Sequence, residues 1–213
     1  MDPIETLMNE HRLIERGIDA LLSFADEVRR KSSDEKEELG KFVTFIREFA
    51  DGIHHGKEEN ILFATMVEAG FPGDGGPIAV MLMEHAEGRG YVQALAELQL
   101  QDAAWSDEDR QAVADAAYGY GNLLRQHIHK EDAILYPMAE QRLPPHLMNR
   151  VADECERFEA SRAGSGEADR LHALADELIA RHATLTRGEP SPRALAGLGC
   201  HSPRRSSSDP ASA

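Results

Sequence analysis

The chain of 213 residues contains an internal repeat, and this repeat constrains the fold more than any other feature. Residues 54–59 read HHGKEE, and residues 127–132, which follow 73 positions later, read HIHKED. Upstream, the pair at 10–11 reads EH, and the same two letters return 74 positions later at 84–85. Two matches in the same order and with nearly the same spacing predict two copies of one structural unit.

Each unit is predicted to consist of two helices. Apolar residues recur at steps of three, four or seven from Ile4 to Val28, which is the period of an amphipathic helix. Asp2 and Pro3 suit the N-cap and the first helical position, Gly70 suits a helix end, and Ser106 with Asp109 resembles a capping box. No run of alternating β-branched residues predicts a strand. The sequence therefore predicts an all-α fold, an antiparallel up-down four-helix bundle of two similar αα-hairpins over about 3–142.

The remainder of the chain is predicted to add two C-terminal helices, at about 146–163 and 166–186, to a single domain covering 1–187. From 188 to 213 the sequence is rich in Pro, Ser, Gly and Ala, and this composition predicts a disordered tail. Cys155 and Cys200 lie far apart without a CxxC spacing, so we expect incidental thiols rather than a disulfide framework or a zinc ribbon.

The charge of the chain excludes two classes of partner. The formal net charge is -15, whereas nucleic acids and anionic membranes bind basic surfaces. No stretch approaches 18 consecutive apolar residues, and the N-terminus lacks a basic segment followed by an apolar one. We therefore expect a cytoplasmic protein that spans no membrane.

Histidine and glutamate occupy core positions in the repeated helices. His11 lies between Leu7 and Ile14, and His85 lies between Met81 and Val92. The other two helices carry stripes that step by three and four, and each stripe includes a histidine and a glutamate. The stripe on the second helix is Val43, Ile46, Ala50, His54, Glu58, Ile61 and Thr65, and that on the fourth is Val113, Ala117, Tyr120, Leu124, His127, Glu131, Ile134 and Met138.

These side chains are predicted to lie at one level of the bundle. At about 1.5 Å per residue, His11 is about 12 Å and Glu58 about 17 Å from the same end. A buried carboxylate without a partner costs several kcal/mol, and a divalent metal removes that cost. Imidazole with carboxylate suits iron, manganese or zinc, and inward-facing His and Glu of a helix bundle build two-metal sites. The predicted metal ligands are His11, His54, Glu58, His85, His127 and Glu131.

Simpler interpretations exist for each part of this pattern. A single core histidine is usually a hydrogen-bonded structural residue, and HxxxE on a helix is usually a surface pair. The combined pattern favours a metal site. His55 and His129 are turned by about 100° from their neighbours, so we expect them to face away from the core. Glu10 and Glu84 either support the histidines or lie on the helix surface, and the histidines outside the repeat are expected to be solvated: His146, His172, His182 and His201.

In these motifs the chain resembles the hemerythrin-like, or HHE cation-binding, family. The resemblance covers about 3–142, and the later helices are similar to the C-terminal extension of bacterial members. It implies two non-haem iron ions with an oxo or hydroxo bridge, zinc or manganese being the alternatives. It also implies four terminal ligands and two bridging carboxylates. The terminal ligands would be His11, His54, His85 and His127, and the bridges Glu58 and Glu131.

The chain departs from oxygen-carrying hemerythrin at two places. Arg89 stands where that protein has the second histidine of HxxxH, and HxxxE reaches Glu131 where that protein has HxxxxD. Asp132 stands at the HxxxxD spacing, so either acid could bridge. One histidine fewer puts reversible oxygen carriage in doubt and leaves room for an exchangeable ligand.

The resemblance implies a protein that binds or senses O2 or a related small molecule, so its partner would be a small diatomic or peroxide ligand. The alternatives are a di-iron oxidoreductase acting on peroxide or nitric oxide, an iron-buffering protein and a structural zinc bundle. Binding and catalysis need the same ligands, so the sequence leaves open whether the protein is an enzyme.

Overall fold

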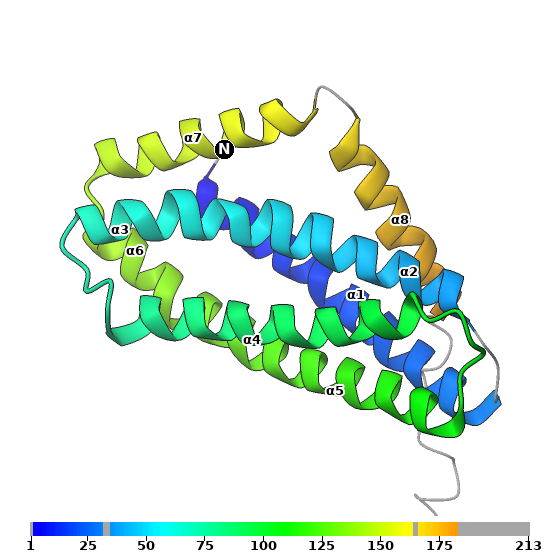
Figure 1. Cartoon of the computed structure of the whole chain (residues 1–213). Helices are drawn as coiled ribbons and strands as arrows, with labels where there is room; N and C mark the ends of the chain where they lie inside the picture. The colour runs from blue at the N-terminus through cyan, green and yellow to red at the C-terminus, as the bar shows by residue number, and fades with distance from the viewer. Residues whose placement is uncertain (1, 32–34, 164–165, 183–213) are drawn as a thin grey trace, which may run out of the picture.

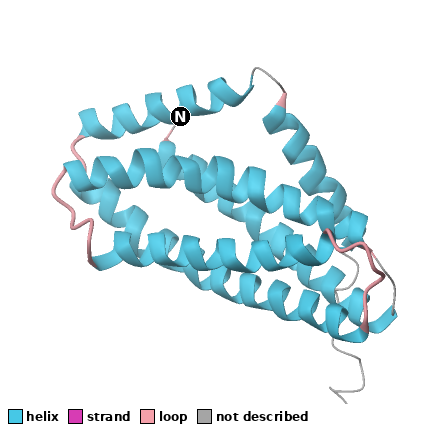
Figure 2. Cartoon of the chain, in the orientation of Figure 1, coloured by secondary structure: helices cyan, strands magenta, loops and turns pink. Residues whose placement is uncertain are grey.

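All elements in the described part of the chain are helices. The computed structural model describes residues 2–31, 35–163 and 166–182. Within these ranges there is no strand, which confirms the all-α class (Figure 2). The predicted tail at 188–213 and the last residues of the second C-terminal helix, 183–186, lie outside the described residues.

Four long helical stretches carry the repeat, and two further helices follow them (Figure 1). The capping box predicted for the fourth stretch is present, since the Asp109 amide donates to the Ser106 hydroxyl and the Ser106 amide donates to the Asp109 carboxylate. The first and third stretches are α1 (Pro3–Lys31) and α4 (Gly76–Gln99). The second stretch comprises α2 (Lys36–Thr44), η1 (Phe45–His55), η2 (Glu58–Phe63) and α3 (Ala64–Glu68). The fourth stretch comprises α5 (Asp107–Lys130), η3 (Glu131–Leu135) and α6 (Tyr136–Arg142). The two further helices are α7 (Pro145–Ala163) and α8 (Glu167–His182).

Neighbouring stretches run antiparallel. Along α1 and α5, Asp19 pairs with Arg125 and, about two turns further on, Asp26 accepts a hydrogen bond from Tyr118. Residue numbers therefore rise along α1 in the direction in which they fall along α5. This antiparallel course brings the repeated motifs of the two hairpins to the same level.

Two apolar clusters fill the interior on either side of the histidines. On α1, Leu7 belongs to the smaller cluster and Ile14 to the larger one, with His11 between them. On α4, Met81 and Val92 are divided in the same way around His85. The polar layer predicted from the repeat thus lies between two water-excluding cores, where an unpaired polar group is costly.

One part of the predicted core stripe on the fourth helix is wrong. Ile134 was predicted to be a core residue, but it is 51% exposed. Leu135, Tyr136 and Ala139 are buried instead. The reason is the π-helical segment η3, in which i→i+5 hydrogen bonds place an additional residue in the turn and advance the buried face by one position.

The prediction for His182 is also wrong. The side chain is buried, with its ring 5.5 Å from the rings of both Phe24 and Phe42, and its Nε2 donates to Glu38 Oε1 at 3.1 Å. This histidine joins α8 to α1 and α2. Three further histidines, His129, His146 and His172, are exposed as predicted, and His201 lies outside the described residues.

Gly17 permits the close approach of α1 and η1. A Cβ at this position would lie 2.5 Å from Cε1 of Phe45, a core side chain only 2% exposed. We expect Gly17→Ala to lower the free energy of unfolding by about 1–3 kcal/mol, because the packed ring has little room to move. Gly90→Ala is the control, since its Cβ meets nothing within 4 Å; helix propensity predicts a gain of up to about 1 kcal/mol. Urea unfolding measures both, and equal changes would show that Gly17 has no special role.

Candidate metal centre

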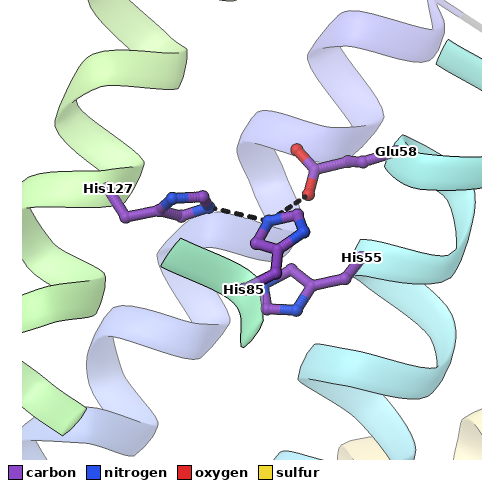
Figure 3. Close-up of side chains that lie close together, drawn as sticks. All are labelled: His55, Glu58, His85 and His127. Carbon is purple, nitrogen blue, oxygen red and sulfur yellow. Dashed lines mark hydrogen bonds and ion pairs between the residues drawn. The ribbon is translucent and has the colours of Figure 1, made fainter. Parts of the chain in front are cut away.

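The structure brings all six predicted ligands into one buried layer. Each of their side chains is at most 1% exposed. Nε2 of His85 and Nε2 of His127 are only 3.0 Å apart, and Figure 3 shows the two rings facing each other beside Glu58. The layer is made of His11, His54, Glu58, His85, His127 and Glu131.

The two carboxylates lie between the hairpins. Glu58 Oε2 is 3.5 Å from Nε2 of both His54 and His85. Glu131 Oε2 is 3.3 Å from His11 Nε2 and 3.1 Å from His127 Nε2. Each carboxylate therefore contacts two histidines, one from each hairpin. A bridging ligand needs this placement.

His55 is a member of the site that the sequence analysis placed wrongly. Its side chain is 4% exposed and stacks on His85 with ring centroids 3.8 Å apart (Figure 3). The cause is again π-helix, because η1 makes i→i+5 hydrogen bonds and turns less than 100° per residue. His54 and His55 therefore both face inward. In the alignment of the two repeats, Ile128 corresponds to His55, and this difference between the two hairpins is visible in the sequence.

The ligand atoms form two neighbouring groups. Within each group, one ligand atom from every residue lies within 4.8 Å of the others. We name the groups the His11 position and the His85 position, and Glu58 belongs to both. The His11 position consists of His11, His54, Glu58 and Glu131; the His85 position consists of His55, Glu58, His85 and His127.

The residues present fit two metal ions. Five buried atoms of these groups have no hydrogen-bond partner: Nε2 of His54, Nε2 of His55, Oε2 of Glu58 and both carboxylate oxygens of Glu131. Buried polar atoms of a native protein are nearly always satisfied, so five together indicate a missing partner. Imidazole and carboxylate donors without a thiolate suit iron, manganese or zinc.

Outer carboxylates hold the histidines in place, and Asp51 does so for His55, whose Nδ1 lies 3.3 Å from its Oδ1. Each accepts a hydrogen bond from Nδ1 of one histidine, which leaves Nε2 to face the centre. Glu10 and Glu84 thus support histidines, the first of the two roles that the sequence left open. Asp132 also serves in this way, whereas Glu131 belongs to the His11 position and also contacts His127. The other pairs are Glu10 with His54 at 2.9 Å, Glu84 with His127 at 3.0 Å, Glu59 with His85 at 2.7 Å and Asp132 with His11 at 2.7 Å.

The buried titratable groups of the layer shift one another's pKa values. Burial raises the pKa of Glu58 well above its ordinary value, and the charge of Glu131 raises it further. Burial also raises the pKa of Glu131, but the neighbouring imidazoles of His11 and His127 hold the pKa of this carboxyl well below its usual range. Burial and the neighbouring His11 lower the pKa of His54 well below its ordinary value, which favours the neutral imidazole that a metal requires.

A buried lysine connects the site to the C-terminal helices. Lys57 is only 1% exposed and donates both to Glu10, the partner of His54, and to Glu159 on α7. Its counterpart in the repeat, Lys130, donates to Glu84 but is 34% exposed. The same lysine position is therefore buried beneath α7 in one hairpin and open to solvent in the other.

A cavity of about 200 Å³ leads to the His85 position between η1 and α4. Arg89 lies at its rim and donates to Asp51 at 2.8 Å and to Glu59 at 2.7 Å. The arginine that replaces a histidine of the oxygen carrier thus joins the outer partners of the site. The lining comprises His55, His85 and Gly88 beside the ligands, Ile46, Val92 and Tyr120 on the walls, and Arg47, Asp51, Arg89 and Gln93 at the rim.

Comparison with known proteins assigns the domain. The family model described as the hemerythrin HHE cation binding domain matches residues 2–139. The chain belongs to this family. Relatives of the hemerythrin-domain protein include uncharacterized proteins of Mycobacterium bovis and Mycobacterium tuberculosis, which are 24% identical over 163 residues, 75% of this chain and 62% of theirs. The chain thus spans less than two thirds of these relatives, and no solved structure matches it. Within the described ranges, the hemerythrin-domain protein has no helix long and apolar enough to cross a membrane.

Proposed function

We propose that this hemerythrin-domain protein holds two iron ions and, through them, binds or senses O2 or a related small molecule. The observation that carries the proposal is the cavity whose inner lining includes His55 and His85, beside donor atoms that lack partners. The iron pair would supply redox chemistry and a coordination position for the small ligand. The sequence predicts four histidine ligands, one fewer than in oxygen-carrying hemerythrin. His55 would supply a fifth imidazole, and this larger ligand set favours ligand binding.

The protein residues have distinct tasks in this proposal. The four long stretches act as an antiparallel four-helix bundle, and the two apolar clusters exclude water from its polar layer. The outer carboxylates fix the direction of each imidazole before metal arrives, so little ordering is needed on binding. Arg89 joins α4 to the second stretch beside the cavity by pairing with both Asp51 and Glu59.

The cavity can be filled by one substitution. Gly88 lines the cavity, and a Cβ on it would make ordinary contacts, 3.5 Å from Leu124 and 3.7 Å from Tyr120, so a larger side chain at this position takes up space at the cavity wall. We expect Gly88→Val to retain two iron ions per chain but to bind azide, a small stand-in ligand, about tenfold more weakly. This corresponds to a crowding cost near 1.4 kcal/mol.

Gly90→Val is the matched control, because it makes the same change two residues further along α4, where a Cβ meets nothing within 4 Å. Azide titration followed by visible absorbance, together with iron analysis, compares the two variants. Equal azide affinity in both variants would refute the cavity as the route to the metals. Continuous consumption of peroxide or nitric oxide by the same preparation would favour the oxidoreductase alternative over reversible binding.

A further inference from the structure

The two metal positions differ in one pair of aromatic rings. The repeat aligns Phe63 with Tyr136, and each ring stacks on the first-helix histidine of a different position. The Tyr136 ring lies 5.4 Å from that of His11 at an interplanar angle of 6°. The Phe63 ring lies 6.1 Å from that of His85 at 17°. The chain thus places a hydroxyl at one position and leaves it out at the other.

The Tyr136 hydroxyl lies among the ligand atoms. The side chain is fully buried, and its hydroxyl donates to Glu58 Oε1 at 2.6 Å while lying 3.4 Å from His11 Nε2. This hydrogen bond engages one oxygen of Glu58 and leaves Oε2 without a partner. The oxygen of Tyr136 therefore occupies space beside the His11 position that an external ligand would need.

The cavity lies at the opposite end of the metal pair. Its lining includes His55 and His85 but not His11, His54 or Tyr136. At that end Phe63 has no hydroxyl that could fill the corresponding space. Two independent features, a cavity and a missing hydroxyl, thus indicate the same open end.

We propose that Tyr136 closes the His11 position to external ligands, so that a small molecule meets the metal pair only at the His85 position. This inference rests on the proposed function and specifies which end of the site takes the ligand. Tyr136 acts as a positioning residue that fixes Glu58 and fills the space next to His11. Phe63 is its counterpart at the end left open.

Exchanging the two side chains tests the assignment in the iron-loaded 213-residue chain. Azide binding is titrated by visible absorbance, with iron content and melting temperature measured on each sample. Wild type is expected to bind one azide per chain. Tyr136→Phe removes the closing hydroxyl and is expected to bind a second azide, whereas Phe63→Tyr is expected to bind azide at least about tenfold more weakly with both iron ions retained.

Two control variants change a hydroxyl elsewhere. Tyr118→Phe removes the hydroxyl that contacts Asp26, and Phe71→Tyr adds one to another buried ring. Azide binding by Tyr136→Phe and Phe63→Tyr that matches these controls would overturn the inference. Should Phe63→Tyr lose its iron, the azide stoichiometry of Tyr136→Phe decides alone. Wild type that holds iron but binds no azide would refute the proposed function, and the inference would then require Tyr136→Phe to create the first azide site.

Discussion

Replacing either central carboxylate by its amide is expected to empty the metal centre. Glu58→Gln and Glu131→Gln keep the size of the side chain but remove a charge that lies between the two hairpins. Because each carboxylate contacts a histidine of either hairpin, its loss should release both ions rather than one. We expect a loss of metal affinity greater than the about 10–100-fold typical of outer partners, measured as iron per chain after dialysis against a chelator.

The adjacent acids provide matched controls for this prediction. Glu59→Gln and Asp132→Asn remove acceptors for Nδ1 of His85 and His11, so each is expected to cost about 10–100-fold in affinity while iron is still bound at saturating concentration. Asp132 is the sharper control, because its spacing matches the ligand of an oxygen carrier. If Asp132→Asn empties the centre and Glu131→Gln does not, Asp132 and not Glu131 is the metal ligand on the fourth stretch.

Removing the buried lysine is expected to have the largest effect on stability. Lys57→Ala leaves Glu10, whose side chain is only 13% exposed, without its cation and also releases Glu159 on α7. Breaking a buried ion pair by deleting one partner typically costs about 3–5 kcal/mol, and we expect a loss of that size in the free energy of unfolding. Urea unfolding of the iron-loaded protein measures it.

The repeat supplies the control for Lys57. Lys130→Ala deletes the equivalent lysine, which contacts Glu84 but is partly exposed, so we expect a loss of at most about 1 kcal/mol. Losses of equal size would show that burial beneath α7 does not strengthen the Lys57 pair. A small loss for Lys57→Ala alone would mean that water reaches Glu10 in the variant.

The repeat and the helical period predicted the ligand layer because α1 and α4 are regular α-helices. His11 and His85 lie one position after a supporting glutamate in both, and each lies between two core residues as the 3.6-residue period requires. The same period places Glu58 and Glu131 on the inner face of their helices. Antiparallel neighbours then brought these positions to one level.

The period failed where the helices are not α-helical. The π-helical segments η1 and η3 turned His55 inward and Ile134 outward, and a 3.6-residue pattern contains no signal for either change. His182 was misplaced because only the packing of α8 on α1 and α2 buries it. The hydrogen bond from His11 to Asp132 joins the two hairpins, and such a contact appears only once the chain is folded.

We propose that the five imidazoles and the two central carboxylates hold a pair of iron ions. Elemental analysis of the 213-residue chain, purified from iron-replete cells, is the decisive measurement. The geometry predicts about two metal ions per chain, mainly iron. A purified protein without metal, or one that carries a single zinc ion per chain at full occupancy, would contradict it.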